Sequence, residues 1–266
     1  FIYNLLALLG VHAGFYVALL GGHDPMPWLR LSIGVLMALI VVALSRISMR
    51  LVNDVLEAQG GESAPYMARP PRRNLAVFAI AAYSAGEFLL PGHAVAGWLA
   101  LAAAAAIANL LNDWHVGRPL LQRWALIPYL VYVCMALGYA LIGLGRLSGI
   151  EMTSAGEHLL VVGALGLAVL IVMAVAGRMH SGWGLDHRRW LPGVTLLLCM
   201  AALARALAGT PLASAAHGAG LHGAATLWVF GWSIYLLYSL KPLGGPRPDN
   251  RGGCDEAVPV VETAAR

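Results

Sequence analysis

The chain alternates long apolar runs with short polar connectors. A helix needs about 20 apolar residues to cross the hydrocarbon core of a bilayer, and it must satisfy its backbone hydrogen bonds internally. The runs therefore predict an all-α, polytopic bundle of eight membrane spans. These spans cover residues 3–21, 31–46, 74–92, 94–112, 125–145, 158–177, 191–208 and 223–240. Residues 47–73 form the longest predicted connector, and residues 241–266 are a predicted disordered cytoplasmic tail after a transmembrane domain of residues 1–240.

The composition agrees with this pattern. Of the 266 residues, 59% are hydrophobic and 11% charged, whereas a soluble domain carries about 25% charged residues. Because so few charges cannot cover a soluble core of this length, the lipid bilayer is the expected surrounding. The net charge of +4 does not indicate a nucleic-acid partner, since the arginines lie between apolar stretches and not in a basic run interleaved with aromatics.

The basic residues divide unequally between the two sides of the predicted bundle. Fourteen of the 17 Lys and Arg residues lie on one side, and only Arg30, Arg146 and Arg205 lie on the other. Positive residues accumulate in cytoplasmic loops, so both termini of this chain are predicted to be cytoplasmic. The chain starts at Phe1 without a basic segment or a cleavage site, which favours a fragment or processed form over an intact signal peptide.

Polar side chains in or beside the spans are the candidates for chemistry. Ionisable groups inside a membrane are costly and usually functional, which singles out His12 and Glu87. The ordinary alternative for both is a hydrogen bond between helices. Arg205 is expected to extend toward the outer water, with Glu87 or a haem propionate as the alternative partner.

The histidines are unevenly placed. Imidazole suits iron and copper, and five of the nine histidines lie beside the connectors of the side with few positive charges. These are His23, His93, His158, His217 and His222. They predict a polar or metal-binding surface on that side, although a wet loop explains His217 and His222 equally well.

No familiar catalytic motif is present. Nucleotide-binding glycine motifs, the zinc-protease HExxH pattern and a Ser/His/Asp grouping are all missing from the sequence, so no catalytic residue is predicted. Gly163 and Gly166 in the sixth span predict close approach of helices.

The sixth span carries a specific resemblance. His158-Leu-Leu-Val-Val-Gly163-Ala-Leu-Gly166, followed by Arg178-Met-His180-Ser-Gly182, is similar to the segment H-A-L-T-V-G-A-I-G and the later L-G-H-T-G-R of the NnrS family. Shorter similarities extend it from about residue 30 to 252. They are the run from Arg46 to Gly60, Trp114 with Arg118-Pro-Leu-Leu121, Trp228, Lys241-Pro242 and Pro246-Arg-Pro-Asp249.

The resemblance implies a function. NnrS proteins are polytopic membrane proteins that contain haem and copper and are linked to denitrification and nitric oxide stress. This chain is thus expected in a bacterial inner membrane, with haem, with copper as a further candidate, and with nitric oxide or a related small molecule as partner. Of the candidate ligands, only His158 and His180 match the family's motifs. Together with the candidates taken from their positions in or beside the spans, the expected cofactor-binding residues are His12, His158, His217, His222 and Glu87, and the expected metal ligands are His93 and His180.

The chain also departs from the family pattern. The family's L-G-H reads Arg178-Met-His180, its I-P-F-F-T reads Ser48-Met-Arg-Leu-Val52, and Tyr129 stands where a histidine is expected. Family chains are also longer at the N terminus. These differences predict a divergent or N-terminally shortened member with reduced haem or copper binding.

Two alternatives to a haem protein remain open. The first is a cofactor-free transporter or structural membrane subunit whose histidines serve as proton relays or loop residues. The second is a membrane cytochrome, which would need two histidines on each of two helices, a pattern that is missing here. His158 and His180 cannot share one metal ion within a chain, because about 30 Å of helix separates them.

Overall fold

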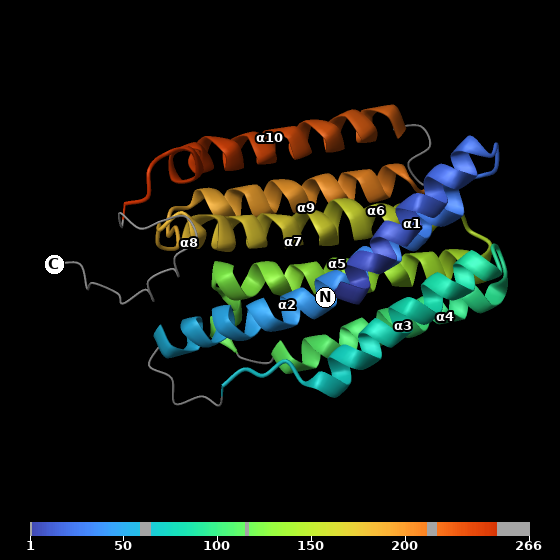
Figure 1. Cartoon of the computed structure of the whole chain (residues 1–266), viewed down its shortest axis with the longest axis horizontal. Helices are drawn as coiled ribbons and strands as arrows, with labels where there is room; N and C mark the ends of the chain where they lie inside the picture. The colour runs from blue at the N-terminus through green and yellow to red at the C-terminus, as the bar shows by residue number, and fades with distance from the viewer. Residues whose placement is uncertain (1, 59–64, 115–116, 212–216, 249–266) are drawn as a thin grey trace.

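Eight long helices run back and forth beside one another in the computed structural model, which describes residues 2–58, 65–114, 117–211 and 217–248 (Figure 1). The described residues contain no β-strand, which confirms the predicted all-α class. The helices are α1 (Ile2–Leu20), α2 (Met26–Ala58), α3 (Pro70–Leu89), α4 (Ala94–Leu110), α5 (Arg123–Ser148), the continuous helix Thr153–His180, α9 (Trp190–Ala208) and α10 (His217–Gly244). Two single 3₁₀ turns, η1 (Leu111–Trp114) and η2 (Arg118–Leu121), precede α5.

The helix Thr153–His180 is interrupted by two π-helical stretches. Its α-helical parts are α6 (Thr153–His158), α7 (Gly166–Val172) and α8 (Arg178–His180). The π-helical stretches η3 (Leu159–Leu165) and η4 (Met173–Gly177) join them. A π-helical turn is wider than an α-helical one and often marks a functional site.

Seven of the eight helices are long and apolar enough to cross a membrane. The other is α3, in which any stretch of 18 residues includes Arg72, Arg73 and Glu87. These three charges lower its hydropathy, but α3 has 20 residues and packs against both α2 and α4. The chain is therefore a multi-pass membrane protein with an eight-helix bundle and seven candidate spans.

Helix α2 is longer than the sequence predicted. The prediction ended its second span at residue 46 and made residues 47–73 a connector, whereas α2 continues to Ala58. Its last turns are amphipathic, with Leu51, Val52 and Leu56 buried and Asp54 exposed. The predicted end was wrong because polar residues on the exposed face of a helix look like a connector in a linear hydropathy pattern.

The other predicted spans begin and end within six residues of the observed helices. Helix α10 continues through residues 241–244, where the prediction began a disordered tail. The part of the predicted tail from residue 249 onward lies outside the described residues.

Helix α5 lies in the middle of the bundle and contacts α2, α4, α6 and α7 (Figure 1). Tyr132, Met135 and Tyr139 of α5 are fully buried. Small residues let the neighbouring helix come close: a Cβ atom on Gly156 would lie 2.5 Å from the Gly138 carbonyl oxygen. The predicted close approach at Gly163 is confirmed in the same way, since a Cβ atom there would lie 3.1 Å from Cys134 Sγ.

Successive helices run in opposite directions, so the connectors gather at two ends of the bundle (Figure 1). We call one the Glu87 end; it holds the connectors after α1, α3, α5 and α9. The other is the Asp186 end, which holds the connectors after α2, α4 and α8. The Glu87 end corresponds to the side that the sequence analysis found poor in positive charge.

Candidate functional site

Two arginines and two glutamates form a network at the Glu87 end. Arg30 Nε donates a hydrogen bond to Glu157 Oε1 at 2.8 Å, and Arg30 Nη1 lies 3.8 Å from Glu87 Oε1. Arg146 Nη2 donates to the same Glu87 oxygen. The four residues come from α2, α3, α5 and α6, so their charges balance and join four helices at one place.

This network is partly buried and incompletely bonded. The Glu87 side chain is only 5% exposed. Its Oε2 atom, the Nε atom of Arg146 and the hydroxyl of Tyr139 are buried with no hydrogen-bond partner among the described residues. A buried polar atom without a partner costs about 1–3 kcal/mol. Open positions of this kind mark where a proton, a water molecule or a ligand group can bind.

Aromatic side chains continue the network toward the middle of the bundle. Tyr83 lies one helical turn before Glu87 on α3, and its ring contacts the ring of Tyr139 edge to face, with centroids 5.3 Å apart. The open Tyr139 hydroxyl is thus part of the same region as Glu87. The region combines two acids, two cations and two phenols within a largely apolar bundle.

The sequence analysis missed most of this network. Glu87 was a candidate, but its only suggested partner was Arg205, whereas the structure pairs it with Arg146 and Arg30. Those two arginines entered the prediction only through the charge count. A signal was available, because the exceptions to the positive-inside pattern were Arg30, Arg146 and Arg205. Arg146 pairs with the buried Glu87, Arg30 pairs with the half-buried Glu157, and Arg205 has a buried Nη1 atom without a partner among the described residues. Basic residues on the unexpected side of a membrane helix bundle were therefore the ones to examine.

His158 follows Glu157 directly and is the half-buried histidine among the predicted ligands. Its Nδ1 atom lies 2.7 Å from the Ser154 carbonyl oxygen. A carbonyl only accepts, so Nδ1 carries the proton and a neutral ring leaves Nε2 with a free lone pair. Metal-binding histidines are held in this way. Arg205 is close enough for its charge to act on the imidazole.

His217 lies at the same end and is held by a different helix. Its Nδ1 atom lies 2.6 Å from the carbonyl oxygen of Ala208 at the end of α9. The next residue, Gly209, approaches the backbone of Ala155 in α6. The end of α9 therefore contacts both the first turn of α10 and the first turn of α6, the short helix that ends at His158.

The remaining predicted ligands are exposed. His12 in α1 and His222 in α10 bond to carbonyl oxygens of their own helices, Leu8 at 2.8 Å and Gly218 at 2.7 Å. His93 lies before α4 and accepts a hydrogen bond from Val95 N at 3.3 Å. None of the three is hydrogen-bonded to the four residues of the network in the described structure.

His180 is exposed at the other end of the bundle, at the last residue of α8. It lies on the same helix as His158, as predicted, 22 positions further along the chain. In the part of the chain that the structure describes, no three His, Cys, Asp or Glu side chains are grouped so that they could hold one metal ion. The structure therefore brings together Glu87 and the region of His158, but it does not gather the predicted histidines into one cluster.

The Asp186 end holds its carboxylates differently. Asp186 is 4% exposed and accepts hydrogen bonds from Arg188 Nη2 at 2.6 Å and Trp190 Nε1 at 2.8 Å, with Arg178 Nη1 at 3.4 Å. Burial alone would raise the pKa of Asp186, but the hydrogen bonds from Arg188 and Trp190 outweigh it and hold that pKa well below its ordinary value. We call this group the Asp186 clamp.

A second carboxylate at this end is also saturated. Asp113, in the turn after α4, is 3% exposed and lies 2.5 Å from Arg72 Nη1 and 3.7 Å from Arg69 Nε. Its Oδ2 atom also accepts a hydrogen bond from the Arg69 backbone at 3.2 Å. This group ties the start of α3 to the turn after α4.

Comparison with known proteins gives one finding. The family model described as NnrS protein matches residues 1–247. No curated protein and no solved structure is similar enough to this chain to be matched. The family match covers the whole helical bundle, including the first helix, where the sequence motifs showed no resemblance.

Proposed function

This chain belongs to the NnrS family, and from that premise we propose that it binds haem at the Glu87 end and acts in the response to nitric oxide or in denitrification. We place it in a bacterial inner membrane with eight spans and both termini cytoplasmic. The orientation is supported by the 14 basic residues at the Asp186 end and along the C-terminal segment, against three at the Glu87 end.

The observation that carries this proposal is the setting of His158. Its Nδ1 atom is bonded to the Ser154 carbonyl oxygen, so Nε2 is available to an iron ion. The imidazole is half-buried at the junction between α6 and the π-helical stretch η3. His158 also matches the family's sequence motif, which the exposed His12 does not.

The surrounding charges suit the acidic groups of haem. Haem carries two carboxylates, and Arg205 has a buried Nη1 atom without a partner among the described residues beside His158. A guanidinium group binds carboxylates well. We propose that Arg205 holds one propionate, while Leu159 and Leu160, both buried, exclude water from the helix face next to His158.

A haem held by one imidazole supplies an open coordination position at which a small diatomic molecule such as nitric oxide can bind. Among the candidate iron ligands, His158 of α6 is the best supported, and His217 is the next candidate. Copper finds less support, since the described residues offer no group of three suitable ligands. The proposal is therefore confined to haem.

The test is a spectrum of the purified chain in detergent. We expect a reduced-minus-oxidised Soret band that shifts when nitric oxide is added to the reduced protein, with about one iron per chain. His158→Ala should remove the band and the iron. His12→Ala is the matched control, because His12 makes the same bond within its own helix but is exposed. Iron content unchanged by His158→Ala would remove His158 from the site.

One observation favours a second function. The buried Oε2 atom of Glu87 and the Tyr139 hydroxyl are both open, and intramembrane acids of this kind carry protons in transporters. In that case the purified protein is colourless. Proteoliposomes should then show proton movement that Glu87→Gln abolishes, and His158→Ala should leave it unchanged.

A further inference from the structure

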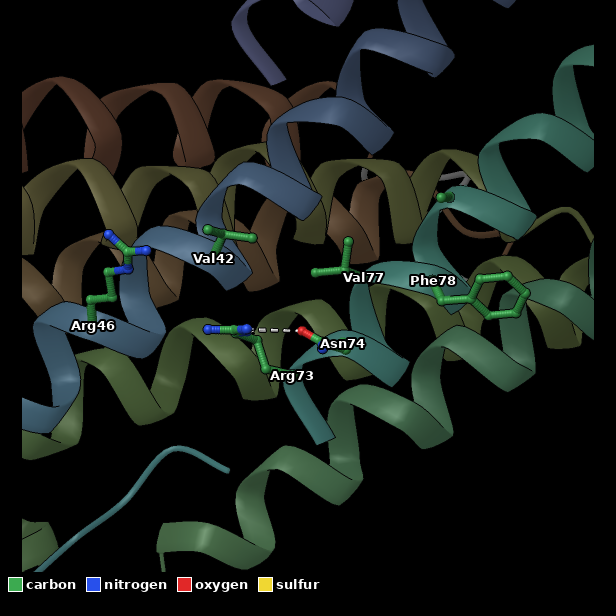
Figure 2. Close-up of a pocket in the computed structure, with 7 residues that line it drawn as sticks. Val42, Arg46, Arg73, Asn74, Val77 and Phe78 are labelled. Carbon is green, nitrogen blue, oxygen red and sulfur yellow. Dashed lines mark hydrogen bonds between the residues drawn. The ribbon is translucent and has the colours of Figure 1, made fainter. Parts of the chain in front are cut away.

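A groove on the lipid-facing side of α2 and α3 is separate from the charge network. Its volume is about 410 Å³, and it is lined by Val42, Arg46, Arg73, Asn74, Val77, Phe78 and Ala81. Figure 2 shows the guanidinium groups of Arg46 and Arg73 at one side of the groove, with Val77 and Phe78 leading away from them. The groove thus has a cationic end and an apolar end.

The two arginines have no acidic partner among the described residues. Arg73 donates from Nε and Nη2 to Asn74 Oδ1 at 3.1 and 3.0 Å, a neutral acceptor that leaves its charge uncompensated. The neighbouring Arg72 is occupied by Asp113. Along α2, Asp54 lies beside Arg50 instead. Arg46 and Arg73 therefore present two positive charges to whatever occupies the groove.

The positions of these residues across the thickness of the bilayer indicate which molecule fills the groove. Arg46 lies 16 residues after Arg30 on α2, which is about 24 Å along a helix. The hydrocarbon core is about 30 Å thick, so with Arg30 at one boundary the Arg46 side chain reaches the opposite one. Val42 and Val77 then lie at hydrocarbon depth. The guanidinium groups are placed at the level of lipid phosphates, and the apolar lining is placed at the level of acyl chains.

We propose that this groove binds one anionic glycerophospholipid, with its phosphate between Arg46 and Arg73 and an acyl chain along Val42, Val77 and Phe78. Basic pockets between membrane helices on the cytoplasmic side bind such headgroups. A free phosphate ion would use the arginines alone and would gain nothing from the apolar end. A zwitterionic lipid would bring a positive headgroup toward two positive charges.

The test uses the full chain, delipidated in detergent and then incubated with dioleoylphosphatidylglycerol. Native mass spectrometry should detect one retained lipid per chain. Retention should fall roughly 10-fold or more in Arg46→Gln/Arg73→Gln. The matched control is Arg118→Gln/Arg189→Gln, which removes the same charge from exposed residues at the same end and should retain the lipid.

A second variant tests the apolar part without changing charge. Ala81→Trp places a large ring in the groove from an exposed position of α3, so folding should persist while lipid retention falls. Thermal melting in phosphatidylcholine, unchanged in all variants, reports that they fold. The proposal would be overturned if the double arginine variant retained as much lipid as the wild type, or if the wild type retained as much phosphatidylcholine. It would also be overturned if inorganic phosphate were retained to the same extent as the lipid. A stable dimer that buries the groove and excludes lipid would overturn it too.

Discussion

At the Asp186 end, one carboxylate is surrounded by donors from nearby residues, whereas at the Glu87 end two carboxylates share two arginines from distant helices. Asp186 is bonded by Arg188 and Trp190, two and four positions away. Glu87 and Arg146 are 59 positions apart, and Arg30 and Glu157 are 127 apart. The first group can form as soon as its loop forms, while the second exists only when four helices have packed.

The two ends also differ in how many of their buried polar atoms lack a hydrogen-bond partner. The Asp186 carboxylate receives hydrogen bonds on both oxygens, but Glu87 Oε2 and Arg146 Nε have no partner among the described residues. A saturated buried ion pair stabilises the loop and has little capacity for a ligand. An incompletely bonded one costs stability and leaves positions for chemistry. This difference supports the proposal that the Asp186 clamp stabilises the fold and that the Glu87 end binds the ligand.

The largest expected effect comes from removing the Asp186 clamp. Asp186→Ala removes the carboxylate that pairs with Arg178 and leaves Trp190 Nε1 without its acceptor. Breaking a buried pair in this way costs about 3–5 kcal/mol of unfolding free energy. Denaturant or thermal unfolding in detergent measures it. Glu151→Ala, at an exposed position in the connector after α5, is the control. Equal losses in the two variants would contradict a stabilising role for the clamp.

Breaking the Glu87 network should cost less. Glu87→Gln keeps an acceptor for Arg146 and leaves Arg30 bonded to Glu157, so the loss is expected to be about 1–2 kcal/mol. Combined with Arg146→Gln in a double-mutant cycle, the pair should show a coupling energy of about 0.5–3 kcal/mol. Strictly additive losses would mean that the two side chains do not interact in the membrane.

The packing that assembles the Glu87 end can be tested at a glycine. In Gly156→Ala the new Cβ atom would lie 2.5 Å from the Gly138 carbonyl oxygen, so α5 and α6 must separate. Overpacking of this kind costs about 1–3 kcal/mol. The added strain should also weaken the Arg30–Glu157 contact, one residue along α6. Gly218→Ala is the control, because a Cβ atom there meets nothing within 4 Å; equal stability of the two variants would contradict the close contact.

The smallest effect is the pH dependence of the clamp. The pKa of Asp186 is lower in the folded chain than in the unfolded chain, so its stabilisation is present above the unfolded value and is lost as the pH falls. The difference in unfolding free energy between the wild type and Asp186→Asn should be constant from about pH 7 to about pH 5 and shrink below about pH 4. If this difference in unfolding free energy already decreased between about pH 7 and about pH 5, the pKa of Asp186 would be raised in the folded chain and not lowered.

The fold was largely predictable from the sequence, and the network was not. Apolar runs of about 20 residues predicted eight helices, and their ends were right to within six residues except at the end of α2. That error arose because an amphipathic helix end that covers the bundle looks polar in a linear pattern. Glu87 and His158 were identified as candidates from their position in or beside a span and, for His158, from a family motif.

The pairing of Glu87 with Arg146 could not be derived from composition or periodicity. Helix period and hydropathy describe interactions within one segment, whereas these partners come from different helices. The sequence also did not show that His12 is exposed. Helix α1 packs on α2 at the side of the bundle, and His12 lies on a face of α1 that the bundle does not cover. Only the packing shows which face of an apolar helix meets protein and which meets lipid.

By itself, the sequence of this chain determined that its surroundings are a lipid bilayer, how many helices it forms and to which family it belongs. These properties depend on the hydrophobicity of each segment and on short motifs, and both can be recognised without knowing how distant segments pack. The tertiary structure decided which charges meet, which polar atoms lack a hydrogen-bond partner and which histidine is half-buried. Those properties depend on how four helices, separated by up to 127 residues, bring their ends together. The free energy of a buried charge is set by its nearest neighbours in space, and a linear pattern does not contain them.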